Sequence, residues 1–188
     1  MAPSKQQEEA SSGNLLTMLL SQAAEIDFSD PNATEAESSS SSDKSNDPTR
    51  LLVQGWEISK LFAIIEFAFL HAHDEQGIMA GLDMMSRKEA IKSINGVFLF
   101  VVKNANGKEQ DFFVDMRKTG TFNLEAPKKP KPDVTIRVGD KDMVRLATGQ
   151  MNPQAAFLKG KLKVKGNVML GLRCQNLLMK EVGKMSRL

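Results

Sequence analysis

The first regular pattern along the chain is a helical one that begins near Trp56. Its apolar residues recur at steps of three and four, which places them on one face of a helix. They are Leu61, Ile64, Ile65, Ala68 and Ala72. The nearly continuous apolar run from Leu61 to Leu70 is about half as long as the ~20 residues that a membrane-spanning helix needs, and it contains Glu66. The pattern therefore predicts a buried helix inside a globular domain.

A second helix and a pair of strands are predicted next. The helix runs from about residue 83 to residue 94 and ends at an Asn-Gly pair. Residues 97–102 form a continuous apolar run, Asn106-Gly107 indicates a hairpin, and apolar residues alternate over 112–116. These signals predict two antiparallel strands.

Shorter elements complete the pattern. Strands are predicted at 121–124 and 134–138, separated by a loop rich in Pro and Lys. Asp140 is expected to cap one short helix, and Asn152 the next, with Pro in its first turn. The last two elements are a strand that carries Leu162 and Val164 and a helix over 168–178.

Residues 1–50 differ from the rest of the chain in composition. They are rich in Ser, Glu, Asp and Asn, with serine at every position of 38–42, and have too few apolar residues to offset the entropy of folding. We therefore expect a disordered acidic tail over 1–50 and one domain over 51–188. An apolar patch at 15–26 is either a transient helix or a docking motif for a partner or for the domain's own groove.

Charge is distributed unevenly between the two parts. Residues 1–50 contain nine acidic and three basic residues, which gives −6, and the remainder contains 22 basic and 14 acidic residues, which gives +8. A basic domain favours anionic lipids, nucleotide-like carriers or nucleic acid. Nucleic acid is not expected, because the chain has no Tyr and one Trp and its Phe residues mostly occupy predicted core positions.

The sequence offers little for catalysis or metal binding. Cys174 with His71 or His73 is the one thiol and base pair available, but Cys174 lies in an apolar helical stripe, where structural cysteines are usual. The two histidines are two positions apart on a predicted helix and would point to different faces. No glycine-rich phosphate loop is present. We expect no enzyme activity, no cofactor and no metal, and a single cysteine permits no intrachain disulfide.

The chain ends in Ser186, Arg187 and Leu188. This tripeptide is a conservative variant of the Ser-Lys-Leu peroxisomal address. It predicts recognition by the peroxisomal import receptor and delivery to the peroxisome matrix, with a second pool in the cytosol.

The segment 144–178 carries a family resemblance. It includes the run LATGQMNPQAAFLKGKLKVKGN at 146–167, which closely resembles the signature of the sterol carrier protein type 2, or non-specific lipid-transfer protein, family. The upstream runs INGVF at 94–98 and PDVTI at 132–136 also look like landmarks of this family. The resemblance covers the chain from about Trp56 to the C-terminus.

The resemblance implies an α/β (α+β) fold. In this fold helices cover one face of a five-stranded, mostly antiparallel sheet and enclose an apolar tunnel. It also implies a non-enzymatic intracellular carrier of fatty acids, fatty acyl-CoA and sterols that supports peroxisomal lipid metabolism. We further expect a monomer that contacts anionic membranes transiently. The alternative is a peroxisomal adaptor or chaperone that protects enzymes of fatty-acid oxidation.

Two sets of site residues follow from this interpretation. The apolar residues expected to line the tunnel, unless they are ordinary core, are Leu146, Met151, Phe157, Leu158, Val168, Met169 and Leu172. Met84, Met85 and Met116 are interpreted as packing residues. Lys159, Lys161, Lys163 and Lys165 alternate along the chain and share one face, where they would attract an acyl-CoA phosphate or an anionic membrane. The alternative is a solvated sheet face whose lysines guard an edge strand against aggregation.

Overall fold

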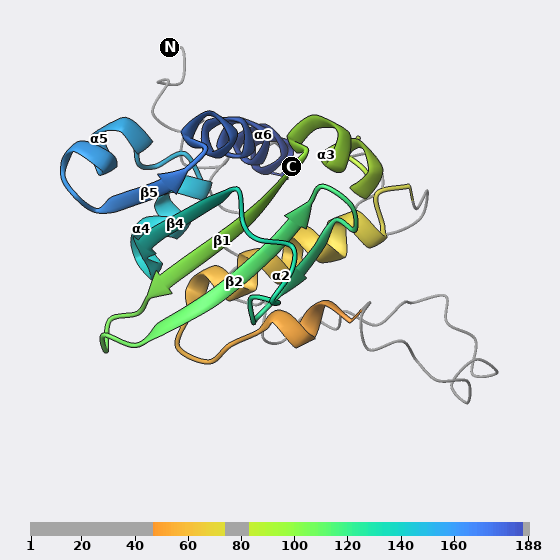
Figure 1. Cartoon of the computed structure of the whole chain (residues 1–188). Helices are drawn as coiled ribbons and strands as arrows, with labels where there is room; N and C mark the ends of the chain where they lie inside the picture. The colour runs from red at the N-terminus through yellow and green to blue at the C-terminus, as the bar shows by residue number, and fades with distance from the viewer. Residues whose placement is uncertain (1–46, 74–82, 186–188) are drawn as a thin grey trace, which may run out of the picture.

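The computed structural model describes residues 47–73 and 83–185 (Figure 1). Its elements are a short 3-10 helix η2 (Pro48–Leu51), α2 (Glu57–Leu70), α3 (Arg87–Ile94), β1 (Gly96–Lys103), β2 (Glu109–Met116), β3 (Thr121–Asn123), β4 (Val134–Gly139), α4 (Asp140–Ala147), α5 (Pro153–Leu158), β5 (Leu162–Gly166) and α6 (Val168–Met185). The predicted α+β class and element order are confirmed. Almost all of the predicted tail lies outside the described residues, as does the apolar patch at 15–26.

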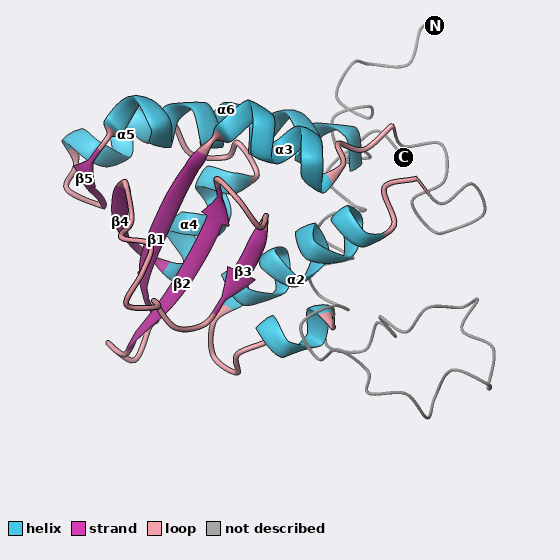
Figure 2. Cartoon of the chain, turned by 45° about the vertical axis from the view of Figure 1, so that its right-hand side comes forward, coloured by secondary structure: helices cyan, strands magenta, loops and turns pink. Residues whose placement is uncertain are grey.

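One mixed sheet organises the fold. Its strand order is β3-β2-β1-β4-β5. Neighbouring strands are antiparallel except β1 and β4, which run parallel with Phe98 opposite Val134. The views in Figures 1 and 2 place α2, α4 and α6 against one face of this sheet. The sheet is thus mostly antiparallel and helix-covered on that face, as the resemblance implies.

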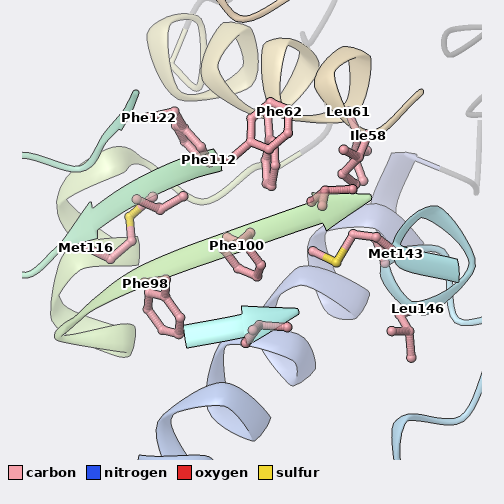
Figure 3. Close-up of a cluster of buried hydrophobic side chains, with 14 of the residues drawn as sticks. Ile58, Leu61, Phe62, Phe98, Phe100, Phe112, Met116, Phe122, Met143 and Leu146 are labelled. Atoms are coloured by element: carbon pink, nitrogen blue, oxygen red, sulfur yellow. The ribbon is translucent and has the colours of Figure 1, made fainter. Parts of the chain in front are cut away.

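The core lies between this face and the helices. Alternate residues of β1 and β2 point into it, because successive strand residues face opposite sides. The ring of Phe62 on α2 lies 5.1 Å from that of Phe112 and 5.7 Å from that of Phe100, measured between centroids. Figure 3 shows Phe62 and Phe112 beneath α2, whereas Phe98 and Phe100 project toward α6. Each such buried side chain contributes about 1.5–3 kcal/mol to folding.

Asp140 caps a different helix from the one predicted. Gly139 occupies the cap position of α4 and makes no side-chain cap, so the sequence prediction for Asp140 was wrong. The Asp140 carboxylate instead accepts hydrogen bonds from the backbone N–H groups of Glu57 (2.8 Å) and Ile58 (2.9 Å) at the start of α2. This contact satisfies two of the free donors at that helix end and joins α2 to α4.

Local capping also sets the bounds of α3 and α5. The helix predicted from residue 83 begins at Arg87, because Ser86 and Glu89 form a reciprocal capping box. Asn95, in the left-handed region at φ 50°, follows its last turn. Asn152 caps α5 as predicted, and its side chain accepts from the N–H groups of Gln154 and Ala155.

Contacts of Asp133 align the ends of β1, β4 and β5. The Asp133 carboxylate accepts hydrogen bonds from Val97 N–H at 2.8 Å and from the Arg117 guanidinium. Desolvation opposes ionisation of this group, but these hydrogen bonds outweigh it and hold the pKa of Asp133 below its usual range. Gly166 has φ +101°, and a Cβ there would overlap the Asp133 carbonyl oxygen. Only glycine therefore fits at this position of the signature.

Glu66 is the charged residue within the apolar run Leu61–Leu70 of α2, and its side chain is fully buried. Its Oε1 lies 2.8 Å from Nη2 of Arg50 and 3.5 Å from Nη2 of Arg87. Burial raises the pKa of Glu66, and the two guanidinium groups offset part of that rise. Arg50 also donates to the carbonyl oxygen of Phe122 at 2.7 Å. The cluster thus ties η2, α2, α3 and β3 together.

Candidate functional site

A cavity of about 430 Å³, called the outer cavity below, lies between the β4–β5 side of the sheet and helices α4, α5 and α6. Its lining is apolar except for Gln154 and Gln175. Phe157 and Leu158 from α5 and Val168 from α6 belong to the lining and are also exposed, so the cavity opens to solvent beside them. Its size and polarity are those of a small-molecule site that binds apolar ligands.

A smaller cavity of about 80 Å³, the inner cavity, continues toward α2 and α3. Four residues line both cavities: Phe100, Met143, Cys174 and Leu178. They come from β1, α4 and α6, and Figure 3 shows Phe100 and Met143 among the buried side chains of the core. We call them the junction. The two cavities therefore adjoin, and a ligand could extend from one into the other after small movements of the junction side chains.

Most of the predicted tunnel residues line the outer cavity. These are Leu146, Phe157, Leu158, Val168 and Leu172. Met151 is partly buried against the core and lines neither cavity, and Met169 is 71% exposed and lines neither. Met151 lies in the bend before α5 and Met169 in the first turn of α6. Both positions are next to lining residues, and the signature alone does not distinguish them from the lining.

The sequence interpretation missed the inner cavity. Met84, Met85 and Met116 belong to the core, as interpreted, but they also line this cavity. The junction between the two cavities was likewise missed. The abundance of methionine was the available signal, since thioether side chains adapt to ligands of varied shape.

The inner cavity has one charged residue in its lining, Glu181. Its carboxylate accepts a hydrogen bond from Met85 N–H at 2.8 Å and lies 2.9 Å from Nζ of Lys184. Lys184 also donates to the carbonyl oxygen of Asp83 at 2.6 Å. These contacts pair Glu181 with Lys184 and fasten the segment before α3 to α6, beside the inner cavity.

Burial raises the pKa of the Cys174 thiol from 9.0 to about 12. The thiol is therefore uncharged at neutral pH. Because the thiolate is the nucleophile, this environment does not suit covalent catalysis. Cys174 acts instead as an apolar wall residue at the junction.

The position of Cys174 gives a direct test of ligand placement. At pH 8 we expect a thiol reagent to label the folded protein far more slowly than the unfolded chain, because the raised pKa leaves about a thousandfold fewer thiolates. Bound fatty acid should slow labelling further, since it would cover the junction. The chain has a single cysteine, so whole-protein labelling reports this site. A labelling rate unchanged by saturating fatty acid would contradict occupancy of the junction.

The four lysines do not all lie on one strand. Lys163 and Lys165 are exposed on β5, opposite in direction to Leu162 and Val164, as expected. The strand begins at Leu162, however, so Lys159 and Lys161 precede it: Lys159 follows the last turn of α5, and Gly160 with φ +71° turns the chain. Nζ of Lys161 lies 3.3 Å from Asp142.

The two histidines considered above as a catalytic base or metal ligands lie outside the helices. α2 ends at Leu70, so His71 and His73 lie in the turn after the helix and not on it. Within 47–73 and 83–185, no three His, Cys, Asp or Glu residues are grouped so that they could hold a metal ion. In the same ranges no helix is long and apolar enough to cross a bilayer. Ser186, Arg187 and Leu188 lie outside the described residues.

Comparisons with known proteins agree with this geometry. A model of the SCP-2 sterol transfer family matches residues 79–179. An oleate-induced peroxisomal protein of Candida maltosa is 42% identical over 87 residues, which cover 46% of this chain and 68% of that protein. A fatty acid-binding protein of Yarrowia lipolytica is 31% identical over 130 residues, which cover 68% of this chain and 93% of that protein.

The structural comparison gives the same relationship. The apo form of sterol carrier protein 2 from Yarrowia lipolytica superposes with a TM-score of 0.57 at 29% identity and covers 68% of this chain and 94% of that one. Animal proteins named sterol carrier protein 2 match over only 16% to 21% of their own length. The chain therefore corresponds to one part of those longer proteins.

Proposed function

The chain belongs to the SCP-2 sterol transfer family, and on this premise we propose that it is a non-enzymatic intracellular carrier of fatty acids, fatty acyl-CoA and sterols. The observation that carries the proposal is the outer cavity, an apolar space of about 430 Å³ that opens to solvent. A sixteen-carbon acyl chain would gain on the order of 12 kcal/mol from leaving water, at ~0.8 kcal/mol per methylene, before the costs of ordering. Such a cavity needs no catalytic group to serve as a carrier.

The two cavities suggest how the cargo lies. The methyl end of an acyl chain enters the outer cavity first and passes the junction into the inner cavity. The outer cavity opens to solvent beside the exposed Phe157 and Leu158, so the polar end of the cargo would remain near these two residues. In this orientation the carboxylate of a fatty acid can stay charged, because it remains in water.

The lysines near the opening fit an activated cargo. Lys159 and Lys161 follow the exposed end of α5, and their ammonium groups would attract the phosphates of an acyl-CoA whose chain occupies the outer cavity. Lys163 and Lys165 add positive charge along β5. Tighter binding of acyl-CoA than of the free fatty acid, lost at high salt, would be the signature of this contribution.

We also propose that the protein resides in the peroxisome. The Ser186-Arg187-Leu188 ending resembles a peroxisomal address, and the similar protein of Candida maltosa is named as peroxisomal. We propose delivery of a monomeric carrier to the matrix by the import receptor, with a second pool in the cytosol. The carrier would deliver acyl groups and sterols to peroxisomal lipid metabolism or remove them from it.

The test is a titration of the full chain with a fluorescent fatty acyl-CoA, together with native mass spectrometry and organic extraction of the purified protein. We expect saturable one-to-one binding and displacement by unlabelled fatty acid. A folded protein that binds neither acyl-CoA, fatty acid nor sterol would contradict the carrier function. That result would favour the adaptor or chaperone alternative, which predicts protein partners instead.

A further inference from the structure

Four large apolar side chains protrude where α5 ends and α6 begins. Phe157 and Leu158 are 55% and 84% exposed, and Val168 and Met169 are 51% and 71% exposed. Figures 1 and 2 place α5 and the first turn of α6 at the same end of the molecule. Phe157, Leu158 and Val168 also line the outer cavity, so these side chains surround its opening. We call the four residues the cavity rim. Apolar groups clustered in water in this way indicate a contact surface.

The charge around the rim is predominantly positive. Residues 143–180 contain seven Lys or Arg residues and no Asp or Glu. Lys159 follows Leu158 directly, and the exposed Arg173 lies one helical turn from Met169 at spacing i, i+4. The next strand adds Arg137, which pairs in register with Lys163. Lys161 is paired with Asp142 and Arg137 with Glu109. The basic residues around the rim still outnumber these two carboxylates, and this excess of positive charge favours a negatively charged partner.

We propose that the cavity rim is the docking surface of this protein for an anionic lipid bilayer. Protruding apolar side chains bordered by Lys and Arg suit insertion at the boundary between headgroups and acyl chains. An acidic protein surface would match the basic residues but would leave Leu158 and Met169 with no apolar environment. The inference rests on the proposed function, because docking at the rim lets an acyl chain move between bilayer and outer cavity without crossing water.

The test uses flotation of the full chain with vesicles of phosphatidylcholine alone or of phosphatidylcholine with phosphatidylserine. We expect binding to the anionic vesicles only, weakened by salt. Met169→Glu should reduce that binding by at least about tenfold, since it places a carboxylate at the inserted surface. Lys159→Glu and Arg173→Glu, which change the exposed basic residues next to Leu158 and Met169, should each reduce it by about fivefold or more. Met179→Glu is the matched control, because Met179 is 41% exposed on the same helix and lines neither cavity.

Cargo binding in the absence of vesicles separates this inference from the proposed function. Met169 lies outside both cavities, so Met169→Glu should bind fluorescent fatty acid as the unaltered protein does. Equal binding of the unaltered protein and Met169→Glu to anionic vesicles would overturn the docking surface, as would equal binding to neutral vesicles. So would binding to an acidic protein surface with none to vesicles. Vesicle binding that requires Met169, in a protein that binds no cargo, would support the docking surface and contradict the carrier.

Discussion

Gly171→Leu is expected to weaken binding of a sixteen-carbon acyl chain by about a hundredfold or more, while the protein unfolds at the same or a higher temperature. Gly171 lines the outer cavity from α6, and a Cβ there would meet Ile136 and Val134 at 4.0 Å, which is an ordinary contact. The added side chain displaces about four methylenes of cargo, at ~0.8 kcal/mol each. Replacing glycine within a helix itself favours folding by about 0.8–1 kcal/mol.

Gly183→Leu is the matched control for this experiment. Gly183 lies on the same helix, no atom lies within 4 Å of a Cβ built there, and it lines neither cavity. The control should gain the same helix propensity and keep its affinity. Affinity is measured by titration with fluorescent acyl-CoA, and stability by thermal unfolding. If both variants bind alike, the cargo does not occupy the outer cavity.

Glu66→Ala is expected to lower the free energy of unfolding by about 3 kcal/mol, because it leaves Arg50 and Arg87 without the carboxylate they share in the core. The side chains of Arg50 and Arg87 are 24% and 23% exposed, so each can recover only part of its hydration. The midpoint of urea unfolding measures the effect. Cargo binding should persist at urea concentrations where the variant remains folded, since Glu66 lines neither cavity.

The ion pair between Glu109 and Arg137 supplies the comparison. Its atoms lie 3.3 Å apart, but the two side chains are 51% and 56% exposed. Glu109→Ala should therefore shift the urea midpoint little, because exposed ion pairs contribute little to stability. Equal shifts for Glu66→Ala and Glu109→Ala would mean that the Arg50–Glu66–Arg87 cluster does not hold α2 and α3 in place.

Local patterns predicted the elements well because their determinants are close in the chain. The continuous run in β1, the alternation in β2 and the Asn152 cap of α5 each depend on neighbouring residues. The start of α3 was predicted early, although Ser86 and Glu89 carry the capping-box spacing that would have located it. The signal for the start of α3 was therefore present in the sequence, but the prediction did not use it.

Asp140 shows the opposite case. Its sequence context suits a cap for α4, yet its carboxylate serves α2, more than eighty residues earlier in the chain. No local pattern contains this contact, because it depends on the packing of α2 beside α4. The same holds for Arg117 and Asp133, which meet only when β2 and β4 are both in the sheet.

The family, the element order and part of the outer cavity wall follow from the amino-acid sequence alone, because the run at 146–167 holds the cap, the turns and several inward apolar positions together. Three further features depend on the folded structure: Met84, Met85 and Met116 line a second cavity, Met169 protrudes into solvent, and Cys174 lies at the junction. Periodicity tells which side of an element is apolar. Whether that side meets packed atoms, an empty cavity or solvent depends on elements distant in the chain.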